Sequence, residues 1–150
     1  MTTDWEELIV TSHLDTLVKV RQLMDEQDYE EAREGIVMLE ETMSIAQKRS
    51  IESQLTRLML HILKWKYQPQ KRSTSWARSI VNARLEIEKW QIEKPSYNNE
   101  FILNSLWERS QKYAIVEAKV EMNLSRKDTF EPTPLTWQEV FEDEYLLEND

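Results

Sequence analysis

Apolar residues recur along most of the chain at alternating intervals of three and four positions, which is the spacing of one face of an α-helix. Prolines at positions 69, 95, 132 and 134 interrupt this pattern, and proline is poorly tolerated inside a helix. The segments between these interruptions predict helices at residues 5–28, 29–67, 73–94, 98–124 and 137–146. We therefore expect an all-α fold, a helical bundle of four to five helices that forms a single domain over residues 1–150 and has no sheet.

The longest segment, residues 29–67, carries two apolar stripes that are out of phase. One stripe runs from Tyr29 to Ala46 and the other from Ile51 to Trp65, and the step of five residues between them departs from helical spacing. A single helix over this segment would be about 55 Å long, which is long for a small domain. We therefore expect a kink or break near residues 43–50.

The short last segment begins with a specific signal for the start of a helix. Thr136 and Glu139 have the spacing of a capping box, and Leu135 and Val140 have the spacing of the accompanying hydrophobic staple. This pattern predicts a helix that starts at Trp137.

The composition agrees with a helical fold and excludes several kinds of site. The 150 residues include one glycine and no cysteine. Glycine supplies the positive φ angles of tight hairpins and phosphate-binding loops, so its scarcity argues against hairpin-rich β folds, Rossmann folds and P-loops. The lack of cysteine excludes disulfides, thiolate zinc sites and a cysteine nucleophile. We expect no metal site and no cofactor.

The sequence contains no pattern typical of export or membrane insertion. The first residues are acidic and lack the basic and apolar regions of a signal peptide. The most apolar run, residues 58–63, is too short to cross a bilayer. We therefore expect a cytoplasmic protein that does not contact a membrane.

Charge is unevenly distributed along this acidic chain. The net charge is −9, yet residues 53–85 contain no acidic residue and seven basic ones. In one interpretation, these cations pair with acidic helices of the same chain or of a second copy. In the other, they form an anion site at the turn around Pro69, where Lys71 and Arg72 precede the free N–H groups of the next helix. The negative net charge argues against binding to duplex DNA.

The sequence around this turn resembles a known family. Residues His61 to Trp76 read HILKWKYQPQKRSTSW, and the similarity continues through Arg84. The closing stretch from Phe130 to Val140 is also similar. Both stretches resemble the family known as domain of unknown function 29, which is abundant in cyanobacteria. The resemblance covers about residues 12–147, and it implies an all-helical fold with no established activity.

Within this signature we distinguish residues that can bind a ligand from residues that build the fold. The candidate anion-binding or signature residues are His61, Lys64, Tyr67, Gln68, Lys71, Arg72, Ser73, Ser75 and Arg84. Trp65, Pro69 and Trp76 form the structural part of the signature. Since both tryptophans belong to apolar stripes on consecutive helices, we expect them to face each other in the core.

Two functions remain open on the sequence. We favour a binding or scaffold protein whose helical hairpin around Pro69 recognises a protein partner, a second copy of the chain or a small anion. No residue has the surroundings of a general base, so no catalytic residue is assigned. The alternative is an enzyme that acts on a phosphate-containing substrate through a polar cluster of His61, Lys64, Tyr67, Arg72 and Ser75. The two functions differ in whether these side chains converge on an open pocket or pair inside the fold.

Overall fold

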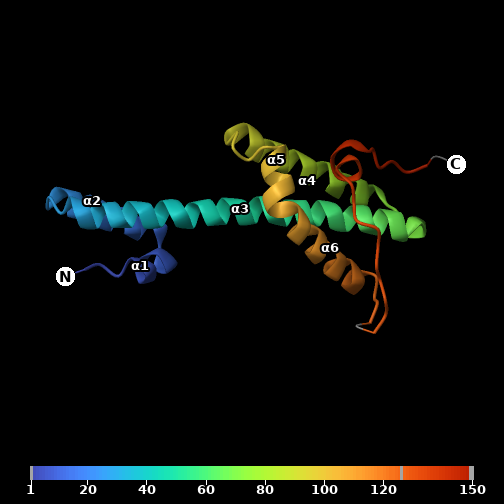
Figure 1. The fold of residues 1–150 in the computed structure, drawn as a ribbon, viewed down its shortest axis with the longest axis horizontal. Helices are drawn as coiled ribbons and strands as arrows, with labels where there is room; N and C mark the ends of the chain where they lie inside the picture. The colour runs from blue at the N-terminus through green and yellow to red at the C-terminus, as the bar shows by residue number, and fades with distance from the viewer. Residues whose placement is uncertain (1, 126, 149–150) are drawn as a thin grey trace. The chain divides into compact units, whose positions relative to one another are not determined.

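All regular structure in the described part of the chain is helical. The computed structural model describes residues 2–125 and 127–148, and no strand occurs among them (Figure 1). The expected all-α fold without a sheet is therefore confirmed for these residues. Contacts divide the chain into two compact units, Met1–Arg49 and Ser50–Asp150, which we call the N-terminal unit and the C-terminal unit.

Two short helices and the first part of a long helix build the N-terminal unit. These elements are α1 (Trp5–Thr11), α2 (His13–Asp25) and the start of α3 (Tyr29–Tyr67). The prediction of one helix over residues 5–28 is wrong, because Ser12 adopts an extended conformation between α1 and α2. Its hydroxyl accepts a hydrogen bond from the backbone N–H of Asp15 at 3.2 Å, and serine is among the preferred residues for such an N-cap.

A tight turn makes α2 and α3 antiparallel neighbours. Gln27 has a left-handed backbone with a φ angle of 63°, and the N–H of Asp28 donates to the carbonyl of Leu23 at 2.8 Å. These are the features of a Schellman motif, which terminates a helix. The Asp28 carboxylate then caps α3 by accepting from the backbone N–H of Glu31 at 3.4 Å. Helices joined by such a short connection pack antiparallel.

The single glycine of the chain lies where α1 packs on α3. Gly35 is buried, and a Cβ atom at this position would lie 2.4 Å from the ring of Trp5. Trp5 Nε1 also donates to the carboxylate of Glu31 at 3.1 Å. Glycine therefore permits the close approach of the indole ring to α3. The core of this unit consists of Trp5, Val20, Leu23 and Ala32.

α3 extends over 39 residues without interruption, so of the expected kink or break near residues 43–50, the break is absent. Residues 43–50 contain no proline or glycine, and nothing in their sequence ends a helix. The change of apolar phase instead marks a change of packing partner, because the boundary between the two units falls between Arg49 and Ser50. No residue of the stretch 40–50 is buried.

The C-terminal unit consists of the second part of α3 and the elements that follow it (Figure 1). These are the 3-10 turn η1 (Pro69–Lys71), α4 (Thr74–Glu93), α5 (Asn99–Phe101), the π-helical turn η2 (Ile102–Leu106), α6 (Trp107–Glu121) and the π-helical turn η3 (Gln138–Glu142). The expected last helix, 137–146, is shorter because Asp143 is extended. The hydroxyl of Tyr145 donates to the carbonyl of Glu139 at 2.6 Å and so replaces a helical hydrogen bond.

The core of the C-terminal unit is built around α3. Leu55, Leu58 and Ile62 are fully buried, and they belong to one cluster with Ile80 of α4 and Val140 of η3. The second apolar stripe of α3 thus faces the core, as its spacing predicts.

The buried side of α6 differs from the side that the sequence indicates. The pattern of large apolar residues predicts one face with Ile102, Leu106, Tyr113, Val116 and Val120. Ile102 and Leu106 are buried, but the three members on α6 are exposed. The buried residues of α6 are Ser110, Ala114 and Ala118. Small side chains at intervals of four allow close helix packing, and a search for large apolar residues does not detect them.

Candidate functional site

Two predicted site residues build the turn between α3 and α4. Arg72 Nε donates to the carbonyl of Trp65 at 2.8 Å, and its guanidinium lies 5.1 Å from the centre of the Trp65 ring. The Ser73 hydroxyl accepts from the backbone N–H of Trp76 at 3.2 Å and caps α4. Helix ends leave backbone carbonyls and N–H groups without helical partners, and these contacts satisfy two of them. Arg72 and Ser73 therefore both have structural contacts.

Lys64 connects three helices of the C-terminal unit. Its ammonium lies 2.7 Å from the carboxylate of Glu121 on α6 and 4.5 Å from the ring centre of Trp76 on α4. The indole ring attracts a cation placed over its face. Trp76 is half-buried beneath this charge, whereas Trp65 is buried. The prediction that both tryptophans lie in the core is therefore correct for Trp65 and wrong for Trp76.

Tyr67, Gln68 and Pro69 end α3. The Tyr67 ring meets Phe130 edge to face, with ring centres 5.3 Å apart. The backbone N–H of Gln68 donates to the carbonyl of Lys64 at 2.9 Å, and Pro69 begins η1. Proline suits the first position of a helical turn, where its missing N–H has no partner to lose.

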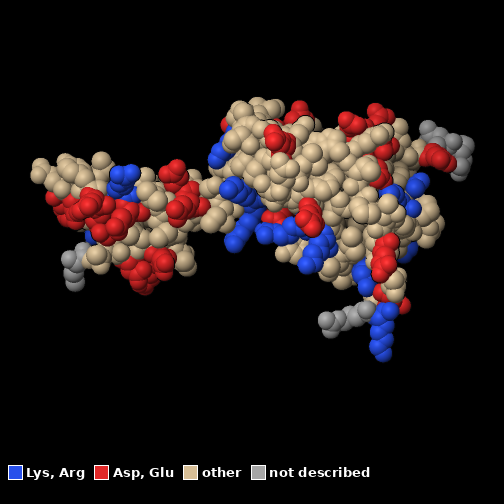
Figure 2. Space-filling model, in the orientation of Figure 1, with Lys and Arg blue, Asp and Glu red and all other residues tan. Residues whose placement is uncertain are grey.

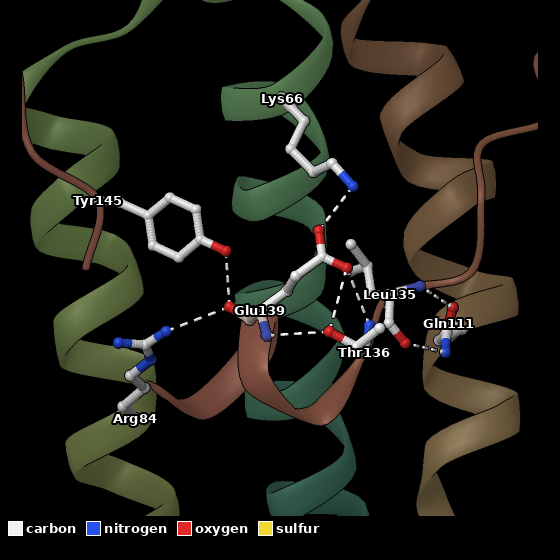
Figure 3. A network of polar contacts seen from close by, with 7 residues as sticks. All are labelled: Lys66, Arg84, Gln111, Leu135, Thr136, Glu139 and Tyr145. Atoms are coloured by element: carbon white, nitrogen blue, oxygen red, sulfur yellow. Dashed lines mark hydrogen bonds and ion pairs between the residues drawn. The ribbon is translucent and has the colours of Figure 1, made fainter. Parts of the chain in front are cut away.

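Glu139 joins the closing segment to α3 (Figure 3). Lys66 Nζ donates to Glu139 Oε2 at 2.6 Å, while Oε1 accepts from the backbone N–H of Thr136 at 3.1 Å. The Thr136 hydroxyl accepts from the backbone N–H of Glu139 at 3.2 Å, so the predicted capping box is confirmed. Burial alone would raise the pKa of Glu139, but hydrogen bonds from Lys66 and Thr136 outweigh it and lower the pKa.

Arg84 binds the same segment from α4. Its Nε donates to the carbonyl of Val140 at 2.8 Å and its Nη2 to the carbonyl of Glu139 at 3.3 Å. The guanidinium lies 5.7 Å from the centre of the Tyr145 ring. Partial burial lowers the pKa of Arg84 from its ordinary value. Arg84 is thus a structural contact between α4 and the closing segment.

Gln111 of α6 completes this network, and sequence reasoning missed it. Its Nε2 donates to the carbonyl of Leu135 at 3.2 Å, and its Oε1 accepts from the backbone N–H of Leu135 at 3.0 Å (Figure 3). One side-chain amide thus satisfies both backbone groups of a residue outside regular structure. The capping-box pattern predicted a helix start directly after Leu135, the residue that Gln111 binds. No sequence pattern indicated Gln111 itself or Tyr145.

His61 has a defined hydrogen-bonding state on α3. Its Nδ1 lies 2.8 Å from the carbonyl of Arg57, and since a carbonyl only accepts, Nδ1 carries the hydrogen. Burial lowers the pKa of His61 below its ordinary value of 6.5. The hydrogen bond to Arg57 opposes this effect, and the positive charge of Lys64 adds to it. We therefore assign His61 as neutral at neutral pH.

Because the pKa of His61 is lowered in the folded chain, the free energy of unfolding is expected to fall as the pH is lowered through and below 6.5. In this range, the unfolded chain binds a proton at His61 more readily than the folded chain, so acid favours unfolding. Urea denaturation across this range measures the slope. His61→Gln lacks the titrating ring and should show a shallower slope, whereas an unchanged slope would contradict the assignment.

The residues of the predicted polar cluster do not pair with one another in the described part of the chain. The cluster consists of His61, Lys64, Tyr67, Arg72 and Ser75. In the described part of the chain, no hydrogen bond or ion pair joins any two of them, and Ser75 is exposed. Among the described residues, no group of three or more His, Asp or Glu side chains could hold a metal ion. This arrangement gives the phosphate-directed enzyme no support.

α2 carries apolar residues on two sides, one buried and one exposed. Its buried residues are Thr16, Val20 and Leu23. Its exposed apolar residues are Leu14, Leu17, Val18 and Met24, with exposed fractions of 69%, 53%, 44% and 47%. At about 100° per residue, the mean directions of the two groups lie roughly 130° apart around the helix axis. The sequence pattern predicts the second group as the core-facing side, and this prediction is wrong because the first group contacts α3.

α3 continues this exposed apolar surface. Tyr29, Ile36 and Met43 recur every seven residues and are 61%, 45% and 51% exposed. Seven residues are close to two helical turns, so the three side chains form one row. α2 and α3 run antiparallel and contact each other through their buried residues. Because both helices are right-handed, the row on α3 then lies on the same side of the helix pair as Leu17 and Met24 on α2. We call Leu14, Leu17, Met24, Tyr29, Ile36 and Met43 the apolar face.

The acidic side chains of the N-terminal unit gather largely away from the apolar face. Residues 1–49 contain 5 basic and 12 acidic residues, a net charge of −7, and Figure 2 shows acidic side chains clustered over this unit. Glu30, Glu34 and Glu41 line a cavity of about 470 Å³ beside Trp5. Arg33 and Glu40, one of each sign, follow the row of Tyr29, Ile36 and Met43 along α3.

Comparisons with known proteins identify a family. Residues 14–146 match the family described as Domain of unknown function DUF29. The searches of curated proteins and of solved structures gave no match. Among the described residues, no helix has the length and apolar character needed to cross a membrane.

Proposed function

The chain belongs to the DUF29 family of domains of unknown function, and we propose that it is a protein-binding module that acts through the apolar face of α2 and α3. The observation that carries this proposal is the exposed apolar row of α2, which lies on a different side of the helix from its buried residues. A helix with a single contact normally presents polar side chains to water. Apolar side chains exposed as a contiguous surface are typical of protein interfaces.

The contacts of the signature residues support a binding surface that lies outside the signature. Lys64, Lys66, Arg72 and Arg84 all bind groups of the C-terminal unit itself. The signature residues therefore build the C-terminal unit, and the apolar face belongs to the N-terminal unit. Exposed apolar side chains also occur on the C-terminal unit, among them Val81, Leu85 and Val120. Recognition of a partner or a local anion by the hairpin around Pro69 remains a prediction. Its support is that Lys71 and Ser75 are exposed beside the start of α4.

Leu17→Glu is expected to abolish retention of the protein partner when the tagged chain is incubated with an extract of its native host. The side chain is 53% exposed, so the charge should leave the fold intact while opposing burial in an interface. Quantitative mass spectrometry measures how much of each host protein is retained. The molecular mass of the tagged chain in solution measures whether a second copy is retained.

Val120→Glu is the matched control. Val120 is 73% exposed on α6 and does not belong to the apolar face. This variant should retain the same partner as the wild type, and circular dichroism should be unchanged for both variants. Equal retention by Leu17→Glu and the wild type would overturn the proposal.

A further inference from the structure

We infer that the partner on the apolar face is a second copy of this chain, which lies antiparallel along α3 and forms a four-helix bundle from two α2–α3 pairs. This inference rests on the proposed binding role of the apolar face and names its occupant. Three observations carry it: the order of apolar residues along α3, the order of charges beside them, and the uncovered stretch of α3 that follows.

The apolar row of α3 is complementary to itself when reversed. Ile36 lies midway between Tyr29 and Met43. An antiparallel copy centred near Ile36 places Ile36 against Ile36 and places Tyr29 against Met43 at each end. A two-fold symmetric dimer needs such a surface, in which each patch matches its own reversed copy. Leu17 and Met24 adjoin this row, so the α2 helices of both copies would also be covered.

The charges beside the row select the antiparallel direction. Arg33 and Glu40 are both exposed, and neither forms a hydrogen bond or ion pair within the described residues. The alignment centred near Ile36 places Arg33 within one residue, about 1.5 Å along the axis, of Glu40 of the second copy, and symmetry repeats the pair. A parallel alignment would place Arg33 near Arg33 and Glu40 near Glu40, which is repulsive.

The same alignment accounts for the exposure of Met43. No residue at positions 40–50 is buried, and Met43 is 51% exposed there. In the antiparallel dimer, the start of α3 in the second copy reaches the level of Met43 and covers it. Long-range repulsion between two units of charge −7 opposes association. This repulsion is limited because Glu30, Glu34 and Glu41 lie beside Trp5 and salt screens charges beyond about 10 Å.

Sedimentation velocity of the full chain tests the inference. The wild type is expected to be a dimer, and Ile36→Glu is expected to weaken dimerisation by about 100-fold or more while circular dichroism is unchanged. Arg33→Glu and Glu40→Arg should each weaken the dimer by about tenfold, since each creates two repulsive contacts. The double variant Arg33→Glu/Glu40→Arg should recover the wild-type dimer. Glu34→Arg, on another side of α3, is the charge control and should not weaken the dimer.

The outcomes separate this inference from the proposed function. A dimer whose double charge variant is no more stable than the single variants would overturn the antiparallel alignment. A monomeric wild type that still retains a host protein, sensitive to Leu17→Glu, would overturn the second copy as occupant and leave the binding role in place. A monomer that retains no protein would overturn both.

Discussion

Replacing Trp65 with alanine is expected to lower the free energy of unfolding of the C-terminal unit by about 3–5 kcal/mol. Trp65 is only 5% exposed. Its ring meets Tyr145 edge to face at 5.9 Å and lies beneath the guanidinium of Arg72. Alanine would leave a cavity where α3, the turn after it and the closing segment meet. Urea denaturation followed by circular dichroism measures the loss without depending on tryptophan fluorescence.

Trp76→Ala provides the comparison within the same signature. The chemical change is identical, but Trp76 is half-buried and contacts the ammonium group of Lys64. We expect a loss of about 1–2 kcal/mol, because less apolar surface leaves water when Trp76 packs. Equal losses for the two variants would contradict the assignment of Trp65 to the core and Trp76 to its edge.

Glu139→Ala is expected to release the closing segment, residues 135–145, from the helices that hold it. The variant loses the capping box with Thr136 and leaves the half-buried ammonium of Lys66 without its carboxylate. Together these changes should cost about 2–3 kcal/mol. Hydrogen exchange should increase at residues 135–145 first, and limited proteolysis should cut there while α3 and α4 stay protected.

A double-mutant cycle isolates the ion pair from the cap. Glu139→Gln removes the charge, Lys66→Met removes its partner, and the double variant should be more stable than the sum of the single losses implies. The lowered pKa of Glu139 means that its contribution is present above pH 4.5 and is lost as the pH falls below it. Strictly additive losses at pH 7 would show that Lys66 and Glu139 are not coupled.

The two stretches that resemble the family are far apart in sequence and are in contact in the structure. Lys66 and Arg84 come from the first stretch, and they bind Glu139 and Val140 of the second (Figure 3). Two of the seven cations of residues 53–85, Lys64 and Lys66, pair with carboxylates of the C-terminal unit, as the first of the two interpretations of that charge expects. Arg72 and Arg84 instead bind backbone carbonyls.

Local interactions made part of this fold predictable. Thr136 and Glu139 form their capping box because its hydrogen bonds span only three residues. The scarcity of glycine and the positions of proline likewise act on the backbone nearby, and they were enough to predict an all-helical chain.

Tertiary contacts decided what these local patterns left open. α2 has apolar residues on two sides, and only the position of α3 determines that Val20 is buried while Leu17 is exposed. The partners of Arg84 and Gln111 lie 56 and 24 residues away, so no spacing rule reveals them. The sequence by itself determined where helices form and where most begin, because propensity and capping are local. Only the tertiary structure decided which side each helix buries and which cations remain free, because those depend on residues that are distant in the chain.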